Sequence, residues 1–174
     1  LNIDEWLEEA ADKLSGIGIE SARLDAEIIL CHTLRHPKTY LHAHNTDPIE
    51  SRLLEIADAR LALRLDRIPV AYIIGHKEFY DRRFKVTAAT LIPRPETEVM
   101  IDILKEIMPK NLPLLPQKLR VVDVGTGSGC IGITAKLEYP ELDVSLVDTS
   151  THALKVAEQN AKMMKAEVQC IKSN

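Results

Sequence analysis

The segment Leu119-Arg-Val-Val-Asp-Val-Gly-Thr-Gly-Ser-Gly-Cys-Ile-Gly132 determines the fold class of this 174-residue chain. Its first half is a short, β-branched apolar run that predicts a buried strand, formed by Leu119, Val121, Val122 and Val124. Glycine then occupies every second position from Gly125 to Gly129, where it permits positive φ angles and lets a ligand approach the backbone. From Cys130 onward apolar residues recur at helical spacing, so the loop is predicted to open onto a helix N-terminus, where N–H groups and the helix dipole gather.

A second apolar run, Val144 to Val147, ends in the acid Asp148. This carboxylate follows Gly127 by about 20 residues, the separation at which an acid at a strand end meets the hydroxyls of a bound ribose. A third short run, Val168 to Ile171, predicts one more strand. Strand, glycine loop, helix, strand and acid together predict the first half of a Rossmann-like α/β domain that binds a nucleoside.

Two ligand classes compete for the glycine loop. Gly127, Gly129 and Gly132 satisfy the dinucleotide spacing G-x-G-x-x-G, which is a weak signal by itself. The string from Asp123 to Gly129 instead resembles the first motif of S-adenosylmethionine-dependent methyltransferases, in which an acid suits the free ammonium of the methionine tail. A third interpretation is that the glycines only form a tight turn. The predicted cofactor-binding residues are Asp123, Gly125, Thr126, Gly127, Ser128, Gly129 and Asp148.

Composition narrows the functional classes. Hydrophobic residues make up 45% and charged residues 28% of the chain, which is typical of a globular protein. The net charge of −4 gives no electrostatic reason to expect nucleic acid as the main partner, and no apolar run approaches the length of a membrane span. The three scattered cysteines and the lack of a basic-then-apolar leader predict reduced thiols and a cytoplasmic location, with an organellar one left open.

Residues 1–65 predict a small helical bundle. One helix is expected to end at Gly16 and Gly18, a second to follow the N-cap Ser21, and a third to begin at Asp47-Pro48-Ile49-Glu50 and run to about Leu65. The residues predicted to face inward are Ile3, Leu7, Ala11 and Leu14, then Leu24, Ile28, Cys31 and Leu34, then Ile49, Leu53, Ile56, Ala57 and Leu61. A zinc site would draw on Cys31, His32, His36, His42 and His44, but their spacing matches no standard ligand pattern, so no metal site is predicted.

From Arg67 the pattern changes. Arg67 to Gly75 predicts an extended connector, and two short strands are predicted to flank a turn at Asp81-Arg82. The string Leu91-Ile-Pro-Arg-Pro-Glu-Thr-Glu98 predicts the start of a helix, with Pro95 in its first turn. Pro109 to Lys118 predicts a loop. The helix before that loop is predicted to bury Met100, Ile103, Leu104 and Ile107.

Four strings carry a resemblance to a known family: Pro69-x-x-Tyr72-x-x-Gly75, Glu78-Phe-Tyr80, Phe84-Lys-Val86 and, above all, Leu91 to Glu98. They resemble the protein-glutamine N5-methyltransferases of the HemK/PrmC type. The resemblance implies S-adenosyl-L-methionine as cofactor and, as substrate, the glutamine of the Gly-Gly-Gln motif in peptide chain release factors. It also implies a helical substrate-recognition domain over 1–67, a hairpin connector over 68–90 and the methyltransferase domain over 91–174. Arg94, Glu96 and Thr97 are then expected to border the cleft where cofactor and substrate meet.

The chain departs from that family at one point. The family's acceptor-binding string, Asn-Pro-Pro-Tyr, does not occur in the 174 residues, so no catalytic residue is predicted. We therefore expect a fragment of a longer enzyme, silent by itself, whose first sheet strand keeps an unpaired edge. Three alternatives stay open: an adenine-N6 methyltransferase acting on nucleic acid, an NAD-dependent oxidoreductase, and a non-catalytic interaction module.

Overall fold

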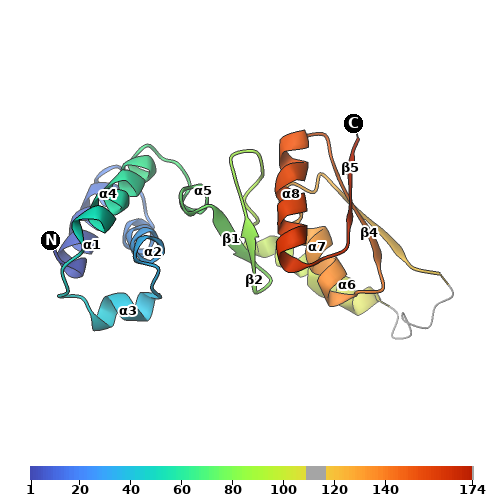
Figure 1. Ribbon diagram of the computed structural model, residues 1–174, viewed down its shortest axis with the longest axis horizontal. Coiled ribbons are helices and arrows are strands. Elements are labelled where there is room, and N and C mark those ends of the chain that lie inside the picture. The colour runs from blue at the N-terminus through green and yellow to red at the C-terminus, as the bar shows by residue number, and fades with distance from the viewer. Residues whose placement is uncertain (109–116, 174) are drawn as a thin grey trace. The chain divides into compact units, whose positions relative to one another are not determined.

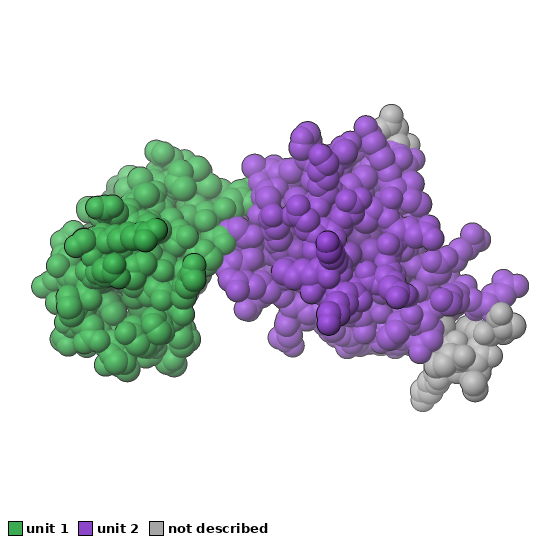
Figure 2. Space-filling view, in the orientation of Figure 1, with its two compact units in different colours: residues 1–74 green, residues 75–174 purple. Residues whose placement is uncertain are grey.

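The computed structural model describes residues 1–108 and 117–173, which form two compact units, Leu1–Ile74 and Gly75–Asn174 (Figures 1 and 2). Each unit has its own hydrophobic core. Most of the loop predicted over Pro109 to Lys118 lies outside the described residues. Within the described ranges, no helix combines the length and the hydropathy needed to cross a membrane.

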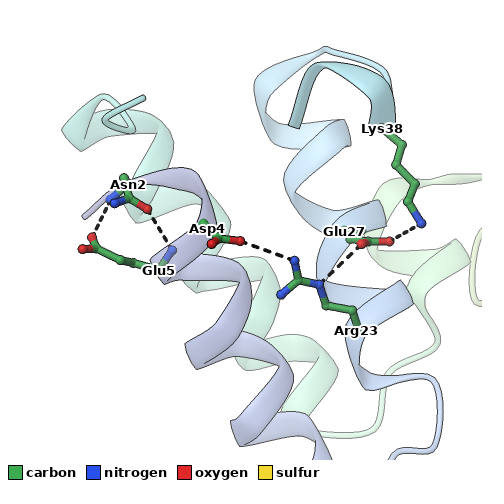
Figure 3. Close-up of polar contacts among 6 residues, drawn as sticks. All are labelled: Asn2, Asp4, Glu5, Arg23, Glu27 and Lys38. Carbon is green, nitrogen blue, oxygen red and sulfur yellow. Dashed lines mark hydrogen bonds and ion pairs between the residues drawn. The ribbon is translucent and has the colours of Figure 1, made fainter. Parts of the chain in front are cut away.

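The first unit is entirely helical apart from one isolated bridge between Asn2 and Pro48. Its helices are α1 (Ile3–Gly16), α2 (Ala22–Leu34), α3 (Lys38–Ala43), α4 (Ser51–Leu65) and α5 (Val70–Ile74). A capping box begins α1: the Asn2 side chain accepts from the Glu5 amide at 2.8 Å, and the Glu5 carboxylate accepts from the Asn2 amide at 2.9 Å (Figure 3).

The core of this unit confirms the helical periodicity but not every predicted face. On α2, Leu24 is 51% exposed, and Ile56 on α4 is 37% exposed, although both were predicted to face inward. On α2 the apolar residues that contact the core lie on a neighbouring face, because α1 and α4 both pack against that face. The buried core residues of the unit include Trp6, Leu7, Ala10, Leu14, Ala26, Ile29, Leu30, Leu41, Ala57 and Leu61.

Two buried carboxylates also hold the first unit together. Asp25 is 6% exposed and accepts from Nε of Arg64 at 2.7 Å, which links α2 to α4. Glu27, also 6% exposed, pairs with Lys38 at 2.6 Å and with Arg23 at 3.4 Å (Figure 3). Burial works against the charge of Glu27, but the ion pairs outweigh it, so the pKa of this carboxyl is lowered.

Two local predictions in this unit were wrong. Residues Val70–Ile74 form the short helix α5 and not an extended connector; the amides of Tyr72 and Ile73 donate to the Pro69 carbonyl, and a proline favours such a first turn. Helix α4 begins at Ser51, with Glu50 and not the predicted Asp47 as its N-cap, so it starts three residues later than predicted; the amide of Ile3 donates to the carbonyl of Asp47 and holds that segment outside the helix.

The second unit begins with the predicted hairpin. Strands β1 (His76–Phe79) and β2 (Arg82–Lys85) pair antiparallel. The two turn residues are Tyr80 and Asp81, with φ angles of 50° and 57°, so the turn lies one residue earlier than predicted. Two positive φ angles give the backbone twist that suits a two-residue hairpin.

A three-stranded parallel sheet follows, with the order β3 (Arg120–Val124), β4 (Asp143–Asp148), β5 (Gln169–Lys172). The crossover helices are α7 (Cys130–Glu138) and α8 (Thr151–Met164), and both lie on the same face of the sheet (Figure 1). Because the opposite face is not covered within the described residues, Val122 is 58% and Val124 is 78% exposed. The prediction that this strand is buried was therefore wrong: Val121 and Asp123 are half-buried, and the other residues of β3 are exposed.

Before this sheet, a turn of 3-10 helix, η1 (Pro95–Glu98), leads into α6 (Val99–Ile107). The predicted inward face of α6 was wrong for three of its four residues: Met100, Ile103 and Ile107 are 55%, 50% and 69% exposed. The fourth, Leu104, packs against the core, and Ile101, which was not predicted, is fully buried. The apolar residues of this helix gather mainly on one side, as the periodicity predicts, but most of that side stays exposed in the described part of the chain, whereas Ile101 lies in the core on which α7 also packs.

Candidate cofactor site

The glycine loop lies where β3 passes into α7. Gly125, Gly127 and Gly129 all have positive φ angles, of 72°, 55° and 83°, and Gly129 is the N-cap of α7. Residues with a side chain rarely adopt these angles, so the alternating glycines are required by the shape of the loop. The strand, loop and helix predicted for Leu119 to Gly132 are confirmed.

Most loop amides already have partners within the chain. The amides of Gly125 and Thr126 both donate to the Val147 carbonyl of β4, at 2.8 and 3.0 Å, and the amide of Gly129 donates to the Thr126 carbonyl at 2.8 Å. The amide of Gly127 donates to Oδ2 of Asp148 at 3.0 Å. The loop therefore offers a ligand a fixed surface tied to β4 and not a row of unpaired N–H groups.

The glycines fall into an open pair and a packed pair. A Cβ atom added at Gly125 would meet nothing within 4 Å, and one at Gly127 would meet only backbone atoms at 4.0 Å. At Gly129 the added atom would lie 2.7 Å from Cδ1 of Ile133, and at Gly132 it would lie 2.3 Å from Cδ2 of Leu146. Gly125 and Gly127 thus line free space, whereas Gly129 and Gly132 allow α7 to pack closely on the sheet.

Asp123 is the next-to-last residue of β3, and its carboxylate binds to the glycine loop. Its Oδ2 accepts from the Thr126 hydroxyl at 2.7 Å and from the Gly132 amide at 2.9 Å. These two bonds join the end of β3 to the loop and to the first turn of α7. In this structure Asp123 therefore stabilises the loop by hydrogen bonds within the chain.

Asp148 ends β4 beside the same loop. Its Oδ1 accepts from the Ser150 amide at 2.8 Å, while Oδ2 accepts from the amide of Gly127. A carboxylate has about four acceptor positions, so two intramolecular bonds leave capacity for the hydroxyls of a ribose. The seven predicted cofactor residues are all gathered within this loop and at the adjacent end of β4.

The Leu91 to Glu98 segment begins beside the loop, since the Leu91 amide nitrogen lies 4.0 Å from the position of a Cβ at Gly127. Arg94 and Glu96 are exposed and Thr97 is half-buried, and no hydrogen bond or ion pair recorded in the described part of the chain links their side chains to the glycine loop. Glu98 has a structural role, because its carboxylate accepts from the Tyr80 amide in the hairpin turn at 2.9 Å.

An ion-pair cluster fixes α6 and the hairpin against α7. Glu138 of α7 pairs with Lys105 at 2.6 Å and with Arg82 at 2.5 Å. The Lys105 hydrogen bond is the main reason why the pKa of the Glu138 carboxyl is lowered; partial burial opposes it and Arg82 assists it. Tyr80 lies under Lys105, with the ammonium 4.6 Å from the ring centroid, and donates its hydroxyl to Asp102 at 2.9 Å.

Sequence reasoning missed one polar residue at the loop, Asn160 on α8. It is fully buried, and its side chain contacts both the hairpin and the Ser128 carbonyl of the glycine loop. The available signal was an asparagine among the buried residues Val156, Ala157 and Ala161, where a poor helix former needs a partner for its amide.

Nucleophilic and metal chemistry find little support in the described residues. Burial raises the pKa of the Cys130 thiol to about 11, so this cysteine at the start of α7 is not a ready nucleophile. No group of three or more His, Cys, Asp or Glu side chains in the described ranges is placed to hold a metal ion. The rings of His36 and His44 both stack on the ring of Tyr40, with centroid distances of 3.8 Å from His36 to Tyr40 and 4.1 Å from Tyr40 to His44.

Known proteins match both units. Residues 5–75 match the family described as PrmC N-terminal domain, and residues 97–174 match the methyltransferase small domain. The release factor glutamine methyltransferase of Koribacter versatilis is 36% identical over 97% of this chain and 59% of its own length. The protein of the same name from Coxiella burnetii is 36% identical over 93% of this chain and 56% of its own length. The chain belongs to the PrmC-type methyltransferase family.

The parallel sheet with its two crossover helices confirms the predicted α/β fold class. The match to the methyltransferase small domain confirms S-adenosyl-L-methionine as the cofactor. The PrmC-type chain described here spans less than two thirds of the length of the curated relatives that it matches. Among solved structures, the Pyrococcus abyssi tRNA (uracil-54, C5)-methyltransferase in complex with S-adenosyl-L-homocysteine gives a TM-score of 0.45 at 12% identity, over 57% of this chain and 23% of its own.

Proposed function

We propose that the protein transfers a methyl group from S-adenosyl-L-methionine to the side-chain amide nitrogen of the glutamine in the Gly-Gly-Gln motif of a peptide chain release factor. The use of this cofactor is supported by the open pair, Gly125 and Gly127, which line free space beside the carboxylate of Asp148. The acceptor half rests on two relatives named release factor glutamine methyltransferase.

In this proposal the open pair would leave room for the cofactor. Asp148 would accept hydrogen bonds from its ribose hydroxyls, and the Asp123 carboxylate would favour its methionine ammonium. Thr126, Ser128 and Gly129 act by holding the loop shape, since Thr126 and Gly129 are bonded to each other across the turn. Two carboxylates beside one loop also suit a cofactor whose sulfonium and ammonium are both positive.

The chemistry is an in-line displacement. The bond from sulfur to the methyl carbon breaks, a bond from the amide nitrogen to that carbon forms, and the nitrogen loses one proton to solvent or to a basic group. An amide nitrogen is a weak nucleophile because its lone pair is delocalised into the carbonyl, so alignment must supply much of the acceleration. We propose that Arg94, Glu96 and Thr97 border the acceptor side, because their segment begins next to Gly127.

The test uses a longer form of the protein, because the 174 residues are predicted to be silent by themselves, and follows tritium from S-adenosyl-L-methionine into a purified release factor. The control is the same factor carrying Ala in place of the Gly-Gly-Gln glutamine. The proposal expects label in the first factor and none in the second. Equal label in both would refute the glutamine as acceptor, and label in DNA alone would favour the adenine-N6 alternative. That the 174 residues by themselves are catalytically inactive stays a prediction. The same assay tests it by comparing the 174-residue form with the longer form.

We also propose that the helical residues 1–67 recognise the release factor, that 68–90 connect the domains and that 91–174 hold the cofactor. A cytoplasmic site of action fits a partner that works in translation termination. Deleting residues 1–67 is expected to leave cofactor affinity unchanged while raising the KM for the release factor. An unchanged KM would contradict the assigned recognition role.

A further inference from the structure

Asn160 on α8 makes three hydrogen bonds with one buried side chain. Its Oδ1 accepts from the Lys85 amide at 2.8 Å, and its Nδ2 donates to the Lys85 carbonyl at 3.0 Å and to the Ser128 carbonyl at 2.8 Å. The side chain is 0% exposed, so water cannot replace any of these partners. The orientation of the amide is fixed by its partners, because an N–H can only meet an acceptor and a carbonyl can only meet a donor.

The third of these bonds acts on the centre of the glycine loop. The peptide group between Ser128 and Gly129 is held at both ends, since its carbonyl accepts from Asn160 and its N–H donates to the Thr126 carbonyl at 2.8 Å. Glycine at positions 127 and 129 would otherwise permit several orientations of this peptide group. Asn160 therefore selects one loop conformation from those that the glycines allow.

The first two bonds join Asn160 to the hairpin, so that Asn160 links the hairpin to the loop. Lys85 is the last residue of β2, and Asn160 satisfies both its N–H and its carbonyl as a neighbouring strand would. From Lys85 the chain runs through Val86, which is 1% exposed, to Leu91, whose amide nitrogen lies beside Gly127. One side chain thus positions the glycine loop together with the start of the segment that passes over it.

We propose that Asn160 is a positioning residue for the cofactor: it holds the glycine loop in its binding-competent conformation and links that conformation to the hairpin. The inference rests on the proposed function, because it takes the loop to be the cofactor site. Affinity for a ligand falls in proportion to the fraction of molecules whose site is competent, so loss of this tie weakens binding without touching the ligand.

The test compares Asn160→Asp and Asn160→Ala with Leu142→Ala in the 174-residue chain. Asp keeps the acceptor for the Lys85 amide but turns an oxygen toward two carbonyls, whereas Ala removes all three bonds. Leu142 is fully buried just before β4, so its truncation destabilises the same unit without altering the loop. Calorimetric titration with S-adenosyl-L-homocysteine is made at a temperature where each variant is folded. Both Asn160 variants are expected to lose affinity by about tenfold or more, with Leu142→Ala within about twofold of the parent.

Equal affinity in the Asn160 variants and Leu142→Ala would overturn the proposal. A readout without ligand separates it from the proposed function: hydrogen exchange of the Gly129 amide, which is expected to be slow in the parent and at least about tenfold faster in Asn160→Asp relative to core amides of α8. If the parent binds no S-adenosyl-L-homocysteine, the proposed function fails, and the exchange rates still decide the role of Asn160. Should the variants not fold, fast Gly129 exchange in the parent itself overturns the proposal.

Discussion

Alanine at Gly125 and at Gly132 is expected to separate ligand binding from packing. At Gly125 the new methyl group meets no protein atom within 4 Å, but φ is 72°, so the left-handed conformation costs about 1–2 kcal/mol of folding stability. At Gly132 the methyl group would lie 2.3 Å from Cδ2 of Leu146 and 3.1 Å from Cβ of Asp123. Overpacking of about 1–3 kcal/mol, offset by about 1 kcal/mol of helix propensity, leaves a loss of about 0–2 kcal/mol, a range that overlaps the loss at Gly125.

The two variants therefore lose similar stability and act as controls for each other. Urea unfolding measures the stability, and calorimetric titration with S-adenosyl-L-homocysteine measures the affinity. Gly125→Ala is expected to lower the affinity by about tenfold or more, because its methyl group enters the space assigned to the ligand, while Gly132→Ala stays within about threefold of the parent. If Gly125→Ala binds as well as Gly132→Ala, the ligand does not lie over the open pair.

Three further predictions concern charged residues. Asp148→Asn is expected to lower the affinity for S-adenosyl-L-homocysteine by about tenfold, because an NH2 group replaces one of the two oxygens that accept from the Gly127 and Ser150 amides and the acceptor loses its charge; unchanged affinity would remove the ribose role. Arg64→Met leaves Asp25 buried without its cation, so unfolding in urea should show a loss of about 3 kcal/mol, and a loss below about 1 kcal/mol would contradict the burial argument. The pKa values of the Glu27 and Glu138 carboxyls are lowered in the folded state, so their ion pairs stabilise the protein fully above the unfolded carboxyl pKa and are lost as pH falls through the folded values. The free energy of unfolding should therefore fall less steeply with decreasing pH in Glu138→Gln than in the parent. Identical slopes in the two proteins would contradict this expectation.

The features that could be predicted best from the sequence are those that depend on local backbone conformation. The three glycines at every second position require positive φ, and the structure has them. The hairpin was found because its flanking strands and turn are local features, and the sheet was found because each strand is a separate apolar run.

The errors arose where tertiary packing selects among equivalent local patterns. The apolar side of helix α6 that the periodicity selects carries Met100 and Ile103, which are exposed, while Ile101 beside that side is the residue buried in the core. Val124 follows the pattern of a buried strand but faces away from both crossover helices. Asn160 was missed for a similar reason: its partners, Lys85 and Ser128, are 75 and 32 residues away, and no local pattern joins them.

We propose that the loop after Val124 and the carboxylate of Asp148 form the site for an adenosine-bearing sulfonium. One calorimetric comparison tests this assignment, in which the folded protein is titrated separately with S-adenosyl-L-methionine and with NAD. We expect saturable heat with S-adenosyl-L-methionine that Asp148→Asn weakens, and none with NAD. Saturable heat with NAD and none with S-adenosyl-L-methionine would contradict it.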